Sequence, residues 1–231
     1  MRVDSISVIA ATRVAASTAH ASHAEGLLSR ALRRAFDILF ALTALVLTAP
    51  AIVVAMVAIR LDSPGPAIFR QRRMGRNGRP FELVKLRGMY LDAEQLFPEL
   101  YAYGRLRAEH ANGYYFHRTD DPRVTRTGRV LRRYSIDELP NFWNVLRGDM
   151  SVVGPRPEIP DLAHMYGEHL DRILSVRPGV TSPAKADGRD GLTLEETIAS
   201  DLEYVVNRSW RLDLATIGRT ARAVLLGHGV S

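Results

Sequence analysis

Two adjacent carboxylates, Asp137 and Glu138, are the residues of this sequence best suited to chemistry. They lie in a block from Ser135 to Pro157 that also carries arginines and closes on a Pro-Arg-Pro triplet. Neighbouring carboxylates differ in environment, so one can stay ionised as a nucleophile or metal ligand while the other handles protons. An aspartate can attack phosphorus to form an acyl phosphate, and arginines with a magnesium ion would neutralise the phosphates that otherwise repel it.

The same block also fits a purely structural role. Ser135 is a favourable N-cap, and acidic residues are favoured in the first turn of a helix. Both roles can hold together, although an Asp-Glu pair taken alone is more often structural. Just before the block, Arg129, Arg132 and Arg133 lie three and four residues apart, which predicts a helix face directed toward Asp137.

Composition limits the kinds of partner. The chain has 231 residues, enough for one domain with an appendage, and a net charge of +6 with a pI near 10.0. This charge favours an anionic partner, which could be nucleic acid, an anionic membrane surface or a phosphorylated substrate. The absence of cysteine excludes a disulfide framework, a thiolate zinc site and a cysteine nucleophile.

An uncharged apolar stretch runs from Ile38 to Ile59. Its length of about 22 residues is what a helix needs to cross the hydrocarbon layer of a membrane, although a buried core helix is the alternative. Arginines flank both ends, so the positive-inside rule places both ends on the cytoplasmic side, and Pro50 near the middle predicts a kink. The residues alone leave a re-entrant helix and a kinked span equally open.

The rest of the chain predicts an α/β fold, more closely α+β and mostly helical, with one small β-hairpin. The hairpin is expected from strands at 67–74 and 80–86, with Asn77-Gly78 in the turn. Helices are expected at 91–106, 161–176, 193–207 and 210–226. The last of them is basic and amphipathic, which suits a membrane interface as well as packing on the core.

Several short motifs occur in order along the chain: Ser63-Pro64-Gly65-Pro66, Phe69-Arg70-Gln71, Gly75-Arg76-Asn77-Gly78, Lys85-Leu86-Arg87, Asp121-Pro122-Arg123, the block from Ser135 to Pro157, and Arg177-Pro178-Gly179-Val180-Thr181. From about Arg30 to about Leu226 the chain resembles the bacterial sugar transferase family, the monotopic polyprenyl-phosphate phosphoglycosyl transferases. This resemblance implies a flexible tail at 1–29, a re-entrant membrane helix at 30–61 broken at Pro50, a catalytic domain at 62–226 and a tail at 227–231. It also implies location at the bacterial inner membrane, with the catalytic domain facing the cytoplasm.

The resemblance further implies a reaction. Family members transfer a sugar phosphate from a UDP-sugar to polyprenyl (undecaprenyl) phosphate, release UMP and start a lipid-linked glycan such as an exopolysaccharide, O-antigen or glycoprotein glycan. Carried over to this chain, Asp137 is the nucleophile and a Mg²⁺ ligand, and Glu138 is its acidic partner. Substrate phosphates are expected to be bound by Lys85, Arg87, Arg132 and Arg156.

Some positions depart from the family pattern, namely Ala49, Leu86, Gly88, Ser182-Pro183, Lys185 and Asp187. Those from 182 onward bear on donor preference, because this segment is expected to shape the donor pocket. A non-catalytic, membrane-anchored basic adaptor is the rival hypothesis, since it explains the charge and the apolar helix equally well. No nucleic-acid partner is expected, and an oligomer is possible.

Overall fold

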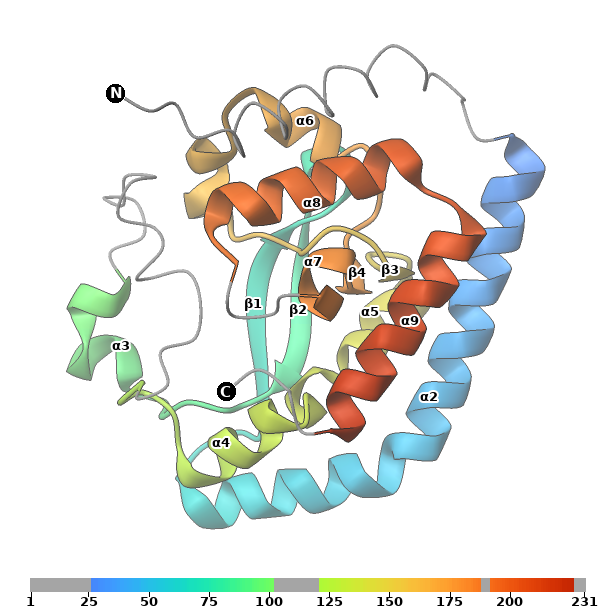
Figure 1. The fold of residues 1–231 in the computed structure, drawn as a ribbon. Helices are drawn as coiled ribbons and strands as arrows, with labels where there is room; N and C mark the ends of the chain where they lie inside the picture. The colour runs from blue at the N-terminus through green and yellow to red at the C-terminus, as the bar shows by residue number, and fades with distance from the viewer. Residues whose placement is uncertain (1–25, 102–120, 188–191, 227–231) are drawn as a thin grey trace.

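The computed structural model describes residues 26–101, 121–187 and 192–226. Within these ranges the chain is mostly helical, with two small sheets (Figure 1). The main elements are α2 (Leu27–Asp62), β1 (Ile68–Met74), β2 (Pro80–Leu86), α3 (Ala93–Leu96), α4 (Arg126–Arg133), α5 (Asn141–Arg147), β3 (Ser151–Val153), α6 (Leu170–Ile173), β4 (Gly179–Thr181), α7 (Pro183–Asp187), α8 (Leu194–Asn207) and α9 (Trp210–Leu225). Short 3₁₀ helices cover Arg76–Gly78, Pro98–Tyr101, Ile136–Glu138 and Pro160–His169.

Several predicted elements are confirmed. β1 and β2 pair antiparallel, and Asn77 and Gly78 in the turn have φ angles of 57° and 72°. α8 begins with the predicted capping box, in which the Thr193 hydroxyl accepts from the Glu196 amide. Residues 1–25 of the predicted N-terminal tail and the whole predicted tail at 227–231 lie outside the described residues, whereas residues 27–29 belong to α2.

Other elements differ from the prediction. The helix expected at 91–106 is two short turns as far as Tyr101, and its remainder lies outside the described residues. The helix expected at 161–176 is a 3₁₀ helix followed by the short α6, because Gly167 with φ 52° interrupts it. The parallel pair β3 and β4 was not predicted, since three-residue strands are too short to show an alternating pattern.

The long helix α2 contacts the same body of the protein at both of its ends. In its first half Ala41 is buried in the main core, and near its C-terminus Ile59 packs with Leu86 and Leu131. In Figure 1 α2 runs along α9, bends and continues beneath α4, and Pro50, which cannot donate the helical hydrogen bond, lies in the middle of it. Its most apolar 18-residue window is only 11% buried, whereas the core helix of a soluble protein is mostly buried.

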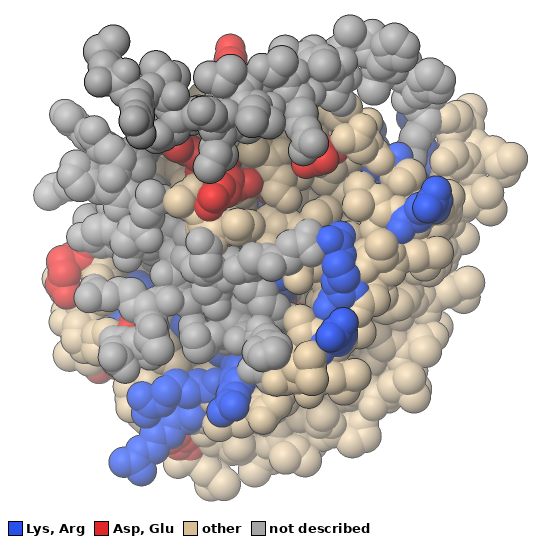
Figure 2. Space-filling model, in the orientation of Figure 1, with Lys and Arg blue, Asp and Glu red and all other residues tan. Residues whose placement is uncertain are grey.

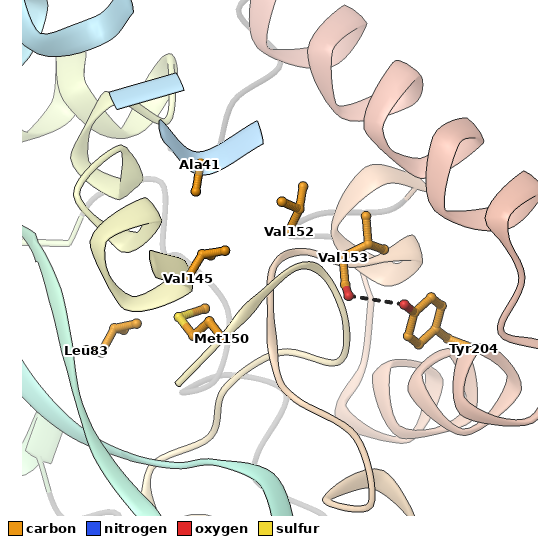
Figure 3. Packing of buried hydrophobic residues seen from close by; sticks show 7 residues of the cluster. All are labelled: Ala41, Leu83, Val145, Met150, Val152, Val153 and Tyr204. Atoms are coloured by element: carbon orange, nitrogen blue, oxygen red, sulfur yellow. Dashed lines mark hydrogen bonds between the residues drawn. The ribbon is translucent and has the colours of Figure 1, made fainter. Parts of the chain in front are cut away.

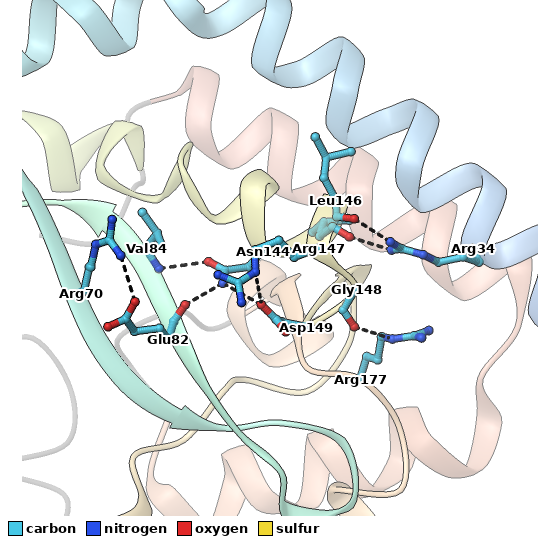
Figure 4. A network of polar contacts seen from close by, with 11 residues as sticks. Arg34, Arg70, Glu82, Val84, Asn144, Leu146, Arg147, Gly148, Asp149 and Arg177 are labelled. Atoms are coloured by element: carbon cyan, nitrogen blue, oxygen red, sulfur yellow. Dashed lines mark hydrogen bonds and ion pairs between the residues drawn. The ribbon is translucent and has the colours of Figure 1, made fainter.

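Polar side chains attach the first part of α2 to the body. The Arg34 guanidinium donates to the carbonyl oxygens of Val145 and Leu146, at 2.6 and 2.8 Å (Figure 4). The Asp37 carboxylate accepts from the hydroxyl of Ser151 and from the amide of Val152 at the start of β3. These contacts fix the direction in which α2 leaves the body.

Arg33 forms a buried ion pair with Asp213 of α9, and each side chain is 8% exposed. The Tyr204 hydroxyl lies 2.9 Å from the second oxygen of Asp213, and the Arg33 guanidinium lies over the Trp210 ring. Arg33→Met would leave the buried Asp213 carboxylate without the charge of Arg33, which is costly in the protein interior. We therefore expect this substitution to lower the free energy of unfolding by about 3–5 kcal/mol.

Thermal unfolding of the detergent-solubilised protein measures this effect, with an expected fall in Tm on the order of 10 °C. Arg60→Met is the matched control, because Arg60 is an exposed arginine of the same helix. Equal Tm values for Arg33→Met and the wild type would contradict the importance of this ion pair.

The main core joins α5 with four other elements, α2, β2, β3 and α8. It contains Ala41 of α2, Leu83 of β2, Val145 of α5, Met150, Val152 and Val153 around β3, and Tyr204 of α8 (Figure 3). The buried Asn144 links two of these elements through hydrogen bonds, because its side chain accepts from the Val84 amide and donates to the Glu82 carbonyl (Figure 4). The turn before α5, which carries the paired carboxylates, is thereby held beside β2.

Candidate active site

Asp137 and Glu138 lie on the short 3₁₀ turn Ile136–Glu138 between α4 and α5. Ser135 lies at the N-cap position of this turn as predicted, but it has a left-handed φ of 54° and its side chain makes no capping hydrogen bond. The left-handed residue ends α4 abruptly and turns the chain, so the carboxylates follow a sharp corner rather than begin a regular helix.

The two carboxylates border different cavities. Asp137 borders a cavity of about 460 Å³ between the β1–β2 hairpin and the turns around Tyr101 and Ile159. Glu138 borders a cavity of about 70 Å³ formed by β2, β4 and α7. Three cations border both cavities, namely Arg73, Lys85 and Arg156. An anion bound among these three cations would therefore lie where the two cavities meet.

Burial and charge act differently on the two acids. Burial raises the pKa of Asp137, and its neighbour Glu138 raises it further, while Lys85 and Arg132 act in the opposite direction. Burial also acts to raise the pKa of Glu138, but the contact with Lys185, together with the charges of Arg156 and Lys85, outweighs burial and lowers it. Glu138 is therefore held as a carboxylate, whereas Asp137 is a buried acid that depends on nearby cations for its charge.

The predicted arginine face on α4 is only partly correct. Arg132 is 8% exposed, borders the larger cavity and interacts electrostatically with Asp137. Arg129 and Arg133 are exposed on the outside of α4. Of the three arginines, Arg132 alone therefore borders the site. The buried face of this short helix packs against Gly88, just after β2.

Close glycine contacts bring these elements together. A Cβ atom on Gly128 of α4 would lie 2.0 Å from the Gly88 carbonyl oxygen, so α4 packs backbone to backbone against the end of β2. A Cβ atom on Gly179 of β4 would lie 2.1 Å from the Gly154 amide nitrogen. The first contact brings Arg132 next to Lys85, and the second brings the turn that carries Arg156 next to β4.

The other predicted phosphate ligands differ in their surroundings. Arg87 borders the larger cavity, but its guanidinium donates to the carbonyl oxygens of Ser63 and Pro64. Arg156 lies between the cavities; its backbone amide donates to buried Asp201, and its Nε lies 3.6 Å from Glu158. Lys85 is partly buried, and burial lowers its pKa to about 8. The role of each in phosphate binding stays a prediction.

Sequence reasoning missed several residues that border the cavities. Arg73 was one of many arginines near the hairpin, and Asn141 has no distinctive motif beyond its place after Pro140. Asp121 and Arg123, noted in the sequence only as part of a family motif, border the larger cavity and form an ion pair at 2.7 Å. Lys185 was noticed only as a departure from the family pattern, and its contact with Glu138 depends on tertiary structure.

Mg²⁺ binding stays a prediction, and at this site it would depend on a single protein carboxylate. Within residues 26–101, 121–187 and 192–226 there is no cluster of three or more histidine or acidic side chains. Mg²⁺ usually keeps several waters and binds one or two carboxylates together with substrate phosphates. Asp137 suits that requirement, whereas Glu138 is engaged by Lys185 and Asp121 by Arg123.

Comparison with known proteins gives consistent matches. The chain is 40% identical over 198 residues to the galactosyl transferase CpsE of Streptococcus agalactiae, which covers 85% of this chain and 43% of CpsE. It is 36% identical over 202 residues to the undecaprenyl-phosphate galactose phosphotransferase of Salmonella typhimurium, covering 87% of this chain and 42% of that protein. It is also 35% identical to the exopolysaccharide production protein ExoY of Sinorhizobium fredii, covering 85% of this chain and 87% of ExoY.

The chain thus spans less than half the length of the first two relatives and most of the third. The sequence profile described as "Bacterial sugar transferase" matches residues 28–227, from the second residue of α2 to just beyond α9. The match includes the apolar helix, both cavities and the paired carboxylates. On these grounds the chain belongs to the bacterial sugar transferase family.

Proposed function

We propose that this protein transfers a sugar phosphate from a UDP-sugar to polyprenyl phosphate, with Asp137 as a covalent nucleophile. The observation that carries the proposal is the placement of Asp137, a buried carboxylate at the edge of a cavity of about 460 Å³ that is also bordered by Lys85, Arg132 and Arg156. Such a set of cations suits a diphosphate. The names of related proteins, which specify undecaprenyl phosphate and UDP-galactose, support this choice of substrates.

The reaction consists of two displacements at one phosphorus atom. In the first, an Asp137 carboxylate oxygen bonds to the phosphorus that carries the sugar, and the bond from that phosphorus to the bridging oxygen breaks, so UMP leaves with the electron pair. In the second, an oxygen of polyprenyl phosphate attacks the same phosphorus and the Asp137 carboxylate leaves. The product is a polyprenyl diphosphate sugar, and neither step requires a proton on Asp137.

The cations of this chain stabilise the charge on the transferred group. Lys85 and Arg156 border both cavities, and Arg132 borders the larger one with Asp137, so the negative charge that accumulates on the phosphoryl oxygens meets fixed positive charge. A Mg²⁺ ion held by Asp137 and the donor phosphates would add Lewis-acid stabilisation of the same charge. The ion pair with Lys185 keeps Glu138 ionised beside the site.

α2 supports a monotopic attachment to the membrane. Most of its large apolar residues from Leu42 to Val54 are exposed, for example Leu47 at 74% and Val54 at 69%, while residues on either side of this stretch pack on the same body. A helix that leaves and returns on one side of the bilayer meets both conditions. Figure 2 shows Lys and Arg side chains over α9 and over α4, beside the largely uncharged surface along α2, which suits contact with an anionic membrane surface.

Release of UMP tests the proposed function. The purified protein is incubated with polyprenyl phosphate, Mg²⁺ and each of several UDP-sugars, and UMP is measured. We expect UMP release from at least one donor. Release beyond the first turnover should require polyprenyl phosphate. A folded, membrane-inserted protein that releases no UMP from any donor would favour the non-catalytic adaptor instead.

The pKa of Lys85 predicts an alkaline limit to activity. Lys85 is charged below its pKa of about 8 and loses its charge as the pH rises through that value. Because the neutral amine no longer attracts a phosphate, kcat/KM for the UDP-sugar should fall in this range. In Lys85→Arg the side chain stays charged, so the fall should move to higher pH. If kcat/KM fell over the same alkaline pH range in both proteins, the fall could not be assigned to Lys85.

A further inference from the structure

The smaller cavity has polar groups that the proposed chemistry does not use. Asn141 opens α5 and is 5% exposed, and its Oδ1 has no hydrogen-bond partner among the residues that the structure describes. It borders the cavity of about 70 Å³ together with Lys185 and Glu138. A buried acceptor without a donor is costly, so this oxygen is a place where a ligand donor would be stabilising.

Lys185 adds a donor to the same cavity. Its ammonium group pairs with the Glu138 carboxylate and lies 3.2 Å from the Val180 carbonyl oxygen. An ammonium has three hydrogens, so these two contacts leave one available for a ligand. The side chain is 14% exposed and borders the cavity beside Val180 of β4.

These groups suit a neutral polar substituent better than a phosphate. The charge of Lys185 is compensated by Glu138, and the apolar side chains Leu83, Val180 and Ala184 form part of the wall. A phosphate oxygen accepts hydrogen bonds and would oppose the acceptor oxygen of Asn141. A sugar hydroxyl or acetamido group can donate to Asn141 and accept from Lys185. The cavity has room for only a few water-sized groups, which excludes a nucleoside.

The position of the cavity also fits the sugar of the donor. Arg73, Lys85 and Arg156 border both cavities, so a phosphate bound among them lies at their junction. In a UDP-sugar the sugar is attached directly to the phosphate that Asp137 attacks. We propose that the smaller cavity receives a polar substituent of the donor sugar, and that Asn141 and Lys185 determine which sugar is accepted. This inference rests on the proposed function.

The test compares the ratios of kcat/KM between donors rather than the absolute rates of the variants. We would measure kcat/KM for UDP-glucose, UDP-galactose, UDP-N-acetylglucosamine and UDP-N-acetylgalactosamine in the wild type, Asn141→Ala and Lys185→Gln. Each variant should change the ratio between the best hexose and the best N-acetylhexosamine donor by about tenfold or more. The KM for polyprenyl phosphate should change less than about twofold. Taking a ratio removes any general loss caused by the disturbed Glu138, and Asn141→Ala leaves the Lys185–Glu138 pair intact.

Arg72→Gln is the control, because Arg72 is an exposed cation of β1 and borders neither cavity. Donor ratios that stay within about twofold in both variants would overturn the inference, as would an effect confined to the acceptor. The proposed function fails separately, when the wild type releases no UMP from any donor, and the inference then fails with it. An active wild type with unchanged ratios in the variants overturns the inference alone.

Discussion

Asp137→Asn is expected to lower turnover by roughly 10⁴-fold or more, because the amide cannot attack phosphorus to form the covalent intermediate. The change is nearly isosteric, and Asp137 sits on a short turn held by the left-handed Ser135 and by the start of α5. We therefore expect the variant to fold and to insert in membranes. The loss would reflect chemistry rather than assembly.

Covalent labelling separates this loss from other causes. A UDP-sugar labelled at the phosphorus that carries the sugar should leave acid-stable label on the wild type and none on Asp137→Asn. Glu138→Gln is the matched variant, since it neutralises the adjacent carboxylate but keeps the nucleophile. It should turn over more slowly and still accept label. Turnover of Asp137→Asn at the wild-type rate, or label on that variant, would refute the role of Asp137.

The parts of the fold that sequence predicts best are those with a local signature. The hairpin needs positive φ at Asn77 and Gly78, and α8 needs its capping box, so both could be placed to within a residue or two. α2 was recognisable because its uncharged apolar stretch is long enough to cross the hydrocarbon layer of a membrane. These predictions rest on short-range physics, which a single sequence contains.

The parts that could not be predicted depend on contacts between distant residues. Nothing local shows that Lys185 pairs with Glu138 or that Arg132, rather than Arg129 or Arg133, turns inward. The contact between Gly128 and Gly88 decides the latter, because it fixes which face of α4 is buried. The capping role predicted for Ser135 failed for the same reason. Serine is a favourable N-cap residue, but the sharp turn between α4 and the paired carboxylates places Ser135 in the left-handed region.

Arg156→Ala is expected to reduce kcat/KM for the donor by roughly 10²–10³-fold, the usual effect of removing one group that stabilises charge in the transition state. Arg156 borders both cavities, and the turn around it is fixed by the hydrogen bond that its backbone amide donates to Asp201 and by the close contact of Gly154 with Gly179. Arg156→Lys keeps the charge but loses the planar fork, so about a tenfold loss is expected. Steady-state UMP release measures both.

The half-reactions show which phosphate Arg156 contacts. A guanidinium on the transferred phosphoryl group assists both displacements, because the same phosphorus is attacked by Asp137 and then by the acceptor. Formation of the labelled enzyme and its discharge by polyprenyl phosphate should then both slow in Arg156→Ala. Arg72→Ala, on the exposed side of β1, should leave both rates unchanged. Slower formation with normal discharge would instead place Arg156 on the departing UMP, since that group is absent from the second step.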